Sequence, residues 1–141
     1  MLVVTPNFNF NGRCEEALAL YGKAFGIKPD FVMRYAQADP QDWKAPLTDE
    51  QKKLVYHAEM RIGGQRCFFA DVIGMDMPAA PAFSLTITFD DAEGVKAAYA
   101  TLVEGGSVLF PFKATTYSSC AVNLIDKFGI RWGLFTEGPA R

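Results

Sequence analysis

The order of predicted strands and helices runs twice along the chain, and this repeat limits the possible folds more than any other feature. The first half is predicted to form a strand, a helix and three strands, over residues 6–11, 14–25, 31–35, 54–62 and 65–71. The second half repeats this order, over residues 83–89, 92–103, 108–112, 120–125 and 130–136. Identity between the halves is slight, so the repeat is structural. We therefore predict an α+β fold with two βαβββ modules, 1–72 and 83–141, and a linker over 73–82.

Short-range signals place the ends of several elements. Gly26 follows the amphipathic pattern of the first helix and is a natural stop for it. The pair Gly63-Gly64 predicts a two-residue hairpin turn, because glycine readily adopts the positive φ that such turns require. The pair Asp90-Asp91 precedes the second helix and predicts its N-terminal cap.

The segment 36–53 is polar and interrupted by prolines, which predicts a long surface loop. A helical turn is expected over 49–53. Loops of this length in compact domains often cover a site, and Trp43 is the one large anchor in this segment. We expect this segment to be more mobile than the sheets or to be ordered mainly by a partner subunit. Trp43 would close over a ligand, or fix the loop to the rest of the protein or to a second subunit.

Composition excludes several classes of function. The formal net charge is −2 with a single histidine, so nothing indicates binding to nucleic acid or to a membrane surface. The three cysteines lie far apart and form no CxxC pair, which predicts reduced thiols without a disulfide or a zinc site. No basic region followed by an apolar stretch of signal length opens the chain, and no apolar run is long enough to cross a bilayer. We therefore expect a cytoplasmic protein.

The strand predicted over 54–62 has two faces of different character. Alternate residues form an apolar set, Tyr56, Ala58, Met60 and Ile62, and a mostly polar set, Val55, His57, Glu59 and Arg61. His57 and Glu59 therefore lie side by side on one face. A carboxylate beside an imidazole favours the imidazolium form, and the two can act as an acid/base pair. Alternatively, His57 forms a hydrogen bond in a buried polar layer or packs at a dimer interface.

Several segments, taken in order along nearly the whole chain, resemble one known family. They are Phe8–Gly12, Cys14–Leu18, Tyr21 to Gly26, His57–Met60, Gly63–Gln65, Phe83–Leu85 and Asp126–Trp132. The resemblance is to the PhnB-like family, also called 3-demethylubiquinone 3-methyltransferase-like, of the glyoxalase/bleomycin-resistance/dioxygenase (vicinal oxygen chelate) superfamily. The methyltransferase name has little support, because the chain has no Gly-rich strand-to-helix loop for a nucleotide-containing methyl donor.

The resemblance implies curved mixed sheets around a cavity, helices on the outer face and a homodimer. Metal-dependent members of the superfamily carry His, Gln or Glu at four points on the first and last strands of the modules. Those points fall here on Thr5 or Pro6, Phe68, Ser84 and Gly133. None of these residues is a strong metal ligand, so we expect a protein without a metal or another cofactor.

The leading prediction is a small-molecule-binding protein. His57 and Glu59 are the candidate catalytic residues, and the candidate ligand-binding residues are Asn7, Asn9, Phe69, Ser84, Thr86 and Trp43. One alternative is a lyase or isomerase that uses His57 and Glu59 as its acid/base pair. Another is a homodimer that sequesters an antibiotic or a metabolite without chemistry. The fold alone does not distinguish these functions.

Overall fold

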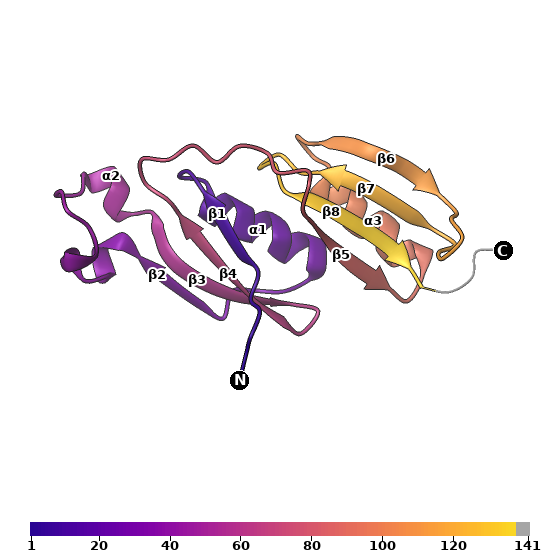
Figure 1. The fold of residues 1–141 in the computed structure, drawn as a ribbon, viewed down its shortest axis with the longest axis horizontal. Helices are drawn as coiled ribbons and strands as arrows, with labels where there is room; N and C mark the ends of the chain where they lie inside the picture. Colours follow the sequence, from indigo (N-terminus) through magenta and orange to yellow (C-terminus); the bar gives the residue numbers. More distant parts are fainter. Residues whose placement is uncertain (138–141) are drawn as a thin grey trace. The chain divides into compact units, whose positions relative to one another are not determined.

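The computed structural model describes residues 1–137, which form two compact units (Figure 1). Unit 1 comprises Met1–Gly22 and Gly26–Met77, and unit 2 comprises Lys23–Phe25 and Pro78–Arg141. The main division therefore lies inside the segment predicted to be a linker. Each unit contains a four-stranded mixed sheet, as the two predicted modules require.

Unit 1 follows the predicted order of elements closely. Its elements are β1 (Asn7–Phe10), α1 (Cys14–Phe25), β2 (Phe31–Arg34), β3 (Val55–Ile62) and β4 (Gln65–Asp71). The sheet order is β1-β4-β3-β2, in which β1 is parallel to β4 and the other pairs are antiparallel. Gly26 ends α1 in the left-handed conformation, with φ of 67°.

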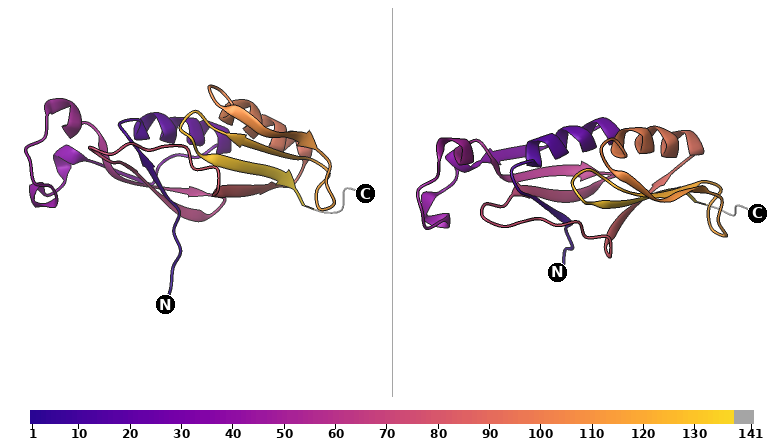
Figure 2. Two further views of the ribbon diagram at one scale, coloured as in Figure 1. Left: turned by 45° about the horizontal axis from the view of Figure 1, so that its top comes forward. Right: turned by 90° about the horizontal axis from the view of Figure 1, so that it is seen from above.

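α1 covers one face of the sheet of unit 1 (Figure 2). Its Tyr21 is fully buried against Phe8 of β1 and Phe69 of β4, with ring centroids 5.8 and 6.2 Å away. Phe8 and Phe69 stack on each other at 4.8 Å. These three aromatic side chains form the centre of the core of unit 1. Their burial stabilises the unit, because each removes a large apolar area from water.

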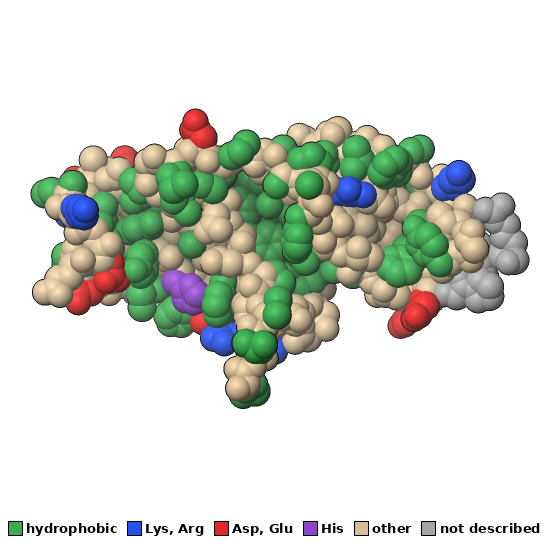
Figure 3. Space-filling view, in the orientation of Figure 1, with side chains coloured by type: hydrophobic (Ala, Val, Ile, Leu, Met, Phe, Trp, Pro, Cys, Tyr) green, Lys and Arg blue, Asp and Glu red, His purple; other side chains and the backbone are tan. Residues whose placement is uncertain are grey.

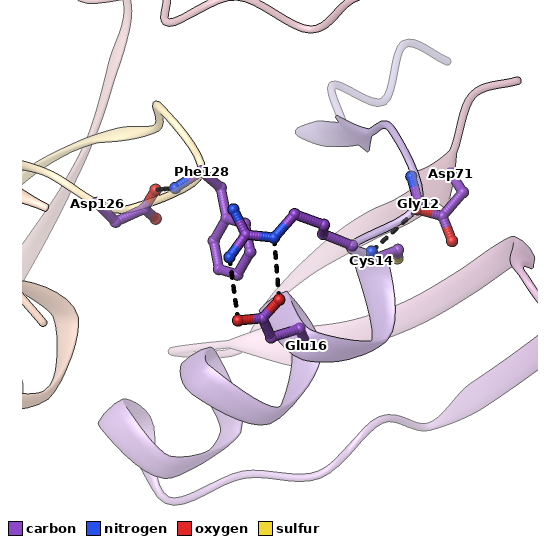
Figure 4. A network of polar contacts seen from close by, with 7 residues as sticks. Gly12, Cys14, Glu16, Asp71, Asp126 and Phe128 are labelled. Carbon is purple, nitrogen blue, oxygen red and sulfur yellow. Dashed lines mark hydrogen bonds and ion pairs between the residues drawn. The ribbon is translucent and has the colours of Figure 1, made fainter. Parts of the chain in front are cut away.

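Asp71, at the end of β4, ties three parts of unit 1 together (Figure 4). Its Oδ1 accepts hydrogen bonds from the backbone N–H groups of Gly12 and Cys14 at 2.9 Å, and its Oδ2 accepts one from Val55 at 3.0 Å. α1 has no capping side chain at its own N-cap residue, Arg13, so Asp71 satisfies the start of the helix from a distant strand. Burial, and then the Asp71 carboxylate, raises the pKa of the Cys14 thiol, so Cys14 is not a reactive nucleophile.

The hairpin between β3 and β4 fixes which side chains face α1. Gly63 and Gly64 both have positive φ, 57° and 83°, as the predicted two-residue turn requires. Ala58, Met60 and Ile62 are buried, as predicted for the apolar face of β3, whereas Tyr56, the fourth residue of that set, is only half-buried. Val55 had been assigned to the polar face and that assignment was wrong. The β2–β3 register shifts between Met33 and Arg34, and Val55 is fully buried.

The segment after β2 contains more local structure than predicted. The predicted helical turn is present as α2 (Asp49–Lys52), and two unpredicted 3-10 turns occur, η1 (Tyr35–Gln37) and η2 (Pro40–Asp42). Thr48 and Gln51 form a capping box at the start of α2. Such reciprocal bonds stabilise a single helical turn that would otherwise be marginal.

Unit 2 repeats this architecture with different residues. Its elements are β5 (Ser84–Phe89), α3 (Ala92–Leu102), β6 (Ser107–Lys113), β7 (Ala121–Ile125) and β8 (Arg131–Thr136). The sheet order is β5-β8-β7-β6, with β5 parallel to β8. Asp91 caps α3 by accepting a hydrogen bond from the Gly94 N–H, as predicted.

Asp126, in the turn before β8, organises unit 2 as Asp71 organises unit 1. Its Oδ1 accepts a hydrogen bond from the N–H group of Phe128 at 2.9 Å (Figure 4). The same oxygen accepts one from the N–H group of Ile130 at 3.1 Å. Its Oδ2 accepts one from the indole Nε1 of Trp132 at 2.9 Å. Trp132 is fully buried, so this bond satisfies a polar group inside the core.

Within residues 1–137, no helix combines the length and the apolar character that a bilayer crossing requires.

Candidate functional site

A row of side chains crosses the face of the unit 1 sheet that α1 leaves uncovered, which we call the open face of unit 1. The register places Phe31 of β2 opposite Glu59 of β3, Glu59 opposite Phe68 of β4, and Phe68 opposite Asn7 of β1. Residues that are paired in this way share one face of the sheet. His57, two residues before Glu59 on β3, lies on the same face and is paired with Met33.

Three of these side chains form a chain of polar contacts. His57 Nε2 lies 2.9 Å from Glu59 Oε2, and Arg66 donates from Nε and Nη2 to Glu59 Oε1 at 2.8 and 2.7 Å. The side chains of His57 and Glu59 are 34% and 22% exposed, so the pair is accessible to a ligand. The structure therefore brings the predicted acid/base pair together and adds Arg66.

The contacts of Glu59 determine which nitrogen of His57 is available. The hydrogen bond from His57, and then that from Arg66, lowers the pKa of the Glu59 carboxyl, which is thus ionised near neutral pH. An ionised carboxylate can only accept, so Nε2 of His57 carries the hydrogen of this bond. In the neutral ring, Nδ1 then keeps its lone pair. No partner for Nδ1 lies among residues 1–137, so it can accept a proton or a hydrogen bond from a ligand.

Aromatic rings flank His57 on this face. The Phe68 ring meets His57 edge-on at 4.8 Å, and the Phe31 ring is 6.1 Å away. The Arg66 guanidinium lies over the Phe68 ring, 4.8 Å from its centroid. Figure 3 shows the histidine at the surface of unit 1, with acidic, basic and apolar side chains around it. The open face therefore combines a proton acceptor with apolar ring surface beside it.

The other residues predicted in the first module divide between the two faces. Asn7 and Asn9 are exposed and lie opposite Phe68 and Ala70, on the open face. Phe69 was expected on the ligand-facing side, and the structure corrects this expectation. Phe69 is fully buried under α1, because the strand alternation brings Phe68 to the open face instead.

Trp43 is anchored within unit 1 by two other aromatic residues. Its ring centroid lies 5.4 Å from that of Tyr35 and 6.0 Å from that of Tyr56. The Tyr56 hydroxyl donates to Asp42 at 2.5 Å, which fixes the segment beside Trp43 to β3. The rings nearest to His57 are those of Phe31 and Phe68, so a contact of Trp43 with a ligand remains a prediction.

Ser84 and Thr86 lie on β5 in unit 2. Ser84 is paired with Arg131 and Thr86 with Gly133, and Thr86 is exposed. These residues share the face of the unit 2 sheet opposite α3, which we call the open face of unit 2. Ligand contact by either residue remains a prediction.

The residues at the superfamily's metal points do not fit a metal ion. The β1 residue paired with Phe68 is Asn7, and the β5 residue paired with Gly133 is Thr86. These two residues take the places expected for Thr5 or Pro6 and for Ser84, and neither is a strong metal ligand. Across residues 1–137, no group of three or more His, Cys, Asp or Glu side chains is placed to hold a metal.

Arg66 and Phe31 are the residues of this cluster that the sequence did not single out, and Phe68 entered only as one of the superfamily's metal points. A signal for one of them was present in the hairpin. A two-residue turn at Gly63-Gly64 pairs Ile62 with Gln65, and counting outward pairs Glu59 with Phe68. The position of the Arg66 guanidinium depends on its side-chain conformation, for which the sequence carries no pattern.

Comparison with solved structures shows proteins of the same fold. One is a glyoxylase/bleomycin resistance protein/dioxygenase domain from Frankia. That domain is 11% identical, with a TM-score of 0.68 over 98% of both chains. The fosfomycin resistance protein FosX from Listeria monocytogenes has a TM-score of 0.63 over 98% of this chain and 94% of its own, at 7% identity. At these identities the similarity is one of fold, and it confirms the predicted fold class.

The particular family follows from the sequence. The family model described as 3-demethylubiquinone-9 3-methyltransferase matches residues 3–135, and the chain belongs to this family. A PhnB protein from Bacillus cereus is 26% identical, with a TM-score of 0.79 over 96% of this chain and 99% of its own. The predicted PhnB-like resemblance is thereby confirmed. No curated protein matches the chain.

Proposed function

We propose that this protein binds a small organic molecule on the open face of unit 1 without a metal ion. The observation that carries the proposal is the His57–Glu59–Arg66 chain of contacts beside Phe68. Glu59 is occupied on both oxygens, so His57 is held in one orientation with Nδ1 available. A pre-oriented polar group between apolar walls is typical of small-ligand sites.

The chemistry of this face indicates the kind of ligand. Nδ1 of neutral His57 is an acceptor, and Phe31 and Phe68 offer apolar ring surface beside it. Asn7 and Asn9 add amide groups that both donate and accept. A planar molecule with an acidic hydroxyl, such as a phenol or an enol, matches these groups. Its hydroxyl would donate to Nδ1.

Methyl transfer, the activity in the family's name, has no support in the residues of this chain. The turn between β1 and α1 contains a single glycine, Gly12, and its N–H is already bonded to Asp71. A Gly-rich loop for a nucleotide-containing donor is therefore absent from this turn.

A second candidate is an enzyme of the lyase or isomerase type. The favouring observation is again the Glu59–His57 contact, since a carboxylate that accepts the hydrogen of one ring nitrogen stabilises the imidazolium formed when the other accepts a proton. In an isomerase, His57 would remove a proton from the ligand through Nδ1 and return it to a different atom. In a lyase, it would remove the proton beside the bond that breaks and give that proton to the leaving group. Glu59 would hold the ring and Arg66 would keep Glu59 ionised.

The predicted homodimer remains part of the proposal. β6 is the edge strand of the unit 2 sheet, and Val108, Leu109 and Phe112 on it are 42%, 36% and 41% exposed. An edge strand with several exposed apolar side chains favours association with another chain. Light scattering is expected to give twice the chain mass at micromolar concentration, and a monomer mass would refute the dimer. Sequestration of a ligand by such a dimer is the outcome if binding occurs without turnover.

Binding and turnover are tested with one set of compounds. A panel of phenols and enols, each beside its methyl ether, is screened by ligand-observed NMR against the wild type, His57→Ala and Thr88→Ala. Thr88 is the matched control, because it is exposed on a strand of unit 2. Hydroxyl compounds should bind the wild type and Thr88→Ala, and lose about tenfold in affinity with His57→Ala. Unchanged binding in His57→Ala would refute the proposed site. Proton exchange or product formation that is lost with His57 would establish the enzyme.

A further inference from the structure

A recess lies within unit 2, over β6, β7 and the loop that joins them. Its volume is about 540 Å³, within the range of small-ligand pockets. Its lining includes the side chains of Phe110, Lys113, Tyr117, Asn123 and Arg131. None of the described residues that line it is acidic.

The strand register explains why these side chains share one face. Phe110 is paired with Asn123, and Lys113 with Ala121, although Phe110 and Lys113 are three residues apart. A register shift between them turns β6, so that both lie on the same face as Asn123. Arg131 reaches this face from β8, with its guanidinium 5.9 Å from the Phe110 ring.

The positive charge of Arg131 is held by neutral groups. Its Nε and Nη2 donate to Asn123 Oδ1 at 3.1 and 2.9 Å, and its Nη1 donates to the Pro81 carbonyl at 2.9 Å. Three of its five N–H hydrogens are thereby used, which leaves two on the guanidinium. Lys113 is exposed, and neither cation has a carboxylate partner among the described residues. By contrast, Arg66 in unit 1 is paired with Glu59.

We propose that unit 2 carries a binding site of its own for an aromatic carboxylate. Arg131 and Lys113 bind the carboxylate, and the rings of Phe110 and Tyr117 contact the apolar part. Arg131 is fixed in place by Asn123 and Pro81, so its two remaining donors are oriented before the ligand arrives. Tyr117 is 61% exposed and rests edge-on against Phe135 at 5.8 Å, so its ring offers surface to a ligand. This site is independent of the one proposed on unit 1.

The test uses 2-naphthoate as the probe, beside 2-naphthamide, which has the same rings and no charge. Binding to the full chain is followed in ¹H–¹⁵N correlation spectra. Naphthoate should shift amide signals from β6, β7 and the loop between them, and naphthamide should bind at least about tenfold more weakly. Equal binding of the two probes, or no shift of these signals with naphthoate, would overturn the proposal.

Substitutions locate the site. Arg131→Gln should weaken naphthoate binding by about tenfold or more, and Lys113→Gln by about threefold. Arg61→Gln is the matched control, because Arg61 is an arginine of unit 1 that also donates to a backbone carbonyl, that of Gly64. It should change the affinity by less than about twofold. If Arg131→Gln does not fold, the test rests on Lys113→Gln. This variant should fold, because Lys113 is exposed on an edge strand. Unchanged affinity in Lys113→Gln would overturn the proposal.

Discussion

Unit 1 and unit 2 have the same order of elements and the same sheet topology, yet their open faces carry different chemistry. In unit 1 the charge of Arg66 is balanced by an ion pair with Glu59, which in turn orients His57. In unit 2 Arg131 donates hydrogen bonds to the Asn123 amide and to the Pro81 backbone carbonyl. Among the described residues its charge has no carboxylate partner. One architecture therefore presents a proton acceptor on one unit and a cation on the other.

The buried framework, by contrast, is similar in the two units. Asp71 and Asp126 each accept three hydrogen bonds from turns and strand ends, although the groups they bind differ. A buried carboxylate with several N–H partners fixes the loops beside it. Each unit therefore fixes its turns with a buried carboxylate, at the end of β4 in unit 1 and in the turn before β8 in unit 2, whereas the chemistry of the two open faces differs.

The largest expected effect separates the two faces of β4. Phe69→Ala removes a fully buried ring from the contact with Phe8 and Tyr21, and should lower the free energy of unfolding by about 3–5 kcal/mol. Phe68→Ala, on the open face, should lower it by less than about 1 kcal/mol. Urea unfolding of both variants measures this. Equal losses would show that the assignment of the faces is wrong.

The next effect tests the shared framework. Asp71→Ala leaves the backbone N–H groups of Gly12, Cys14 and Val55 without their acceptor, and should destabilise the protein by about 2–4 kcal/mol. Asp126→Ala should cost a similar amount, because it removes the acceptor of Trp132 and two backbone groups.

The control for both aspartates is Asp90→Ala, since Asp90 is exposed. Its effect should stay within about 0.5 kcal/mol. If only one of the buried aspartates destabilised the protein beyond this control, the two units would not share a framework.

A smaller effect concerns pH. The folded state lowers the pKa of Glu59 below its ordinary value of 4.5, through His57 and then Arg66. The stability contributed by this carboxylate is therefore present above the pKa of the unfolded chain and is lost as the pH falls through the lower folded value. Glu59→Gln should be slightly less stable than the wild type at pH 7, and the difference should shrink in acid. A difference that grows toward low pH would contradict this direction.

The sequence was sufficient for the elements and for most of the buried faces, because alternation, glycine turns and caps are local signals. α1 ends at Phe25, just before Gly26, and β4 ends at Asp71, as predicted. The predicted faces failed where a pattern changed register. Val55 lies beside the β2–β3 shift. Phe69 lies on the buried face because the Gly63-Gly64 turn pairs it with Ala58.

The candidate site was predictable only in part. The neighbourhood of His57 and Glu59 follows from their spacing on a strand. The role of Arg66 and the uncompensated charge of Arg131 depend on side-chain conformations and on contacts between strands that are distant in the sequence. Such contacts carry no local pattern, so they emerge only from the structure.

The central claim is that Glu59 orients His57 so that Nδ1 accepts a proton or hydrogen bond from a ligand. Since the chain has one histidine, ¹⁵N-labelled histidine gives a single pair of ring nitrogen signals. The neutral ring should carry its hydrogen on Nε2, and the unprotonated Nδ1 signal should move when a phenol from the panel binds. Glu59→Gln should weaken this tautomer preference. A hydrogen on Nδ1, or an Nδ1 signal unchanged by a bound ligand, would contradict the account.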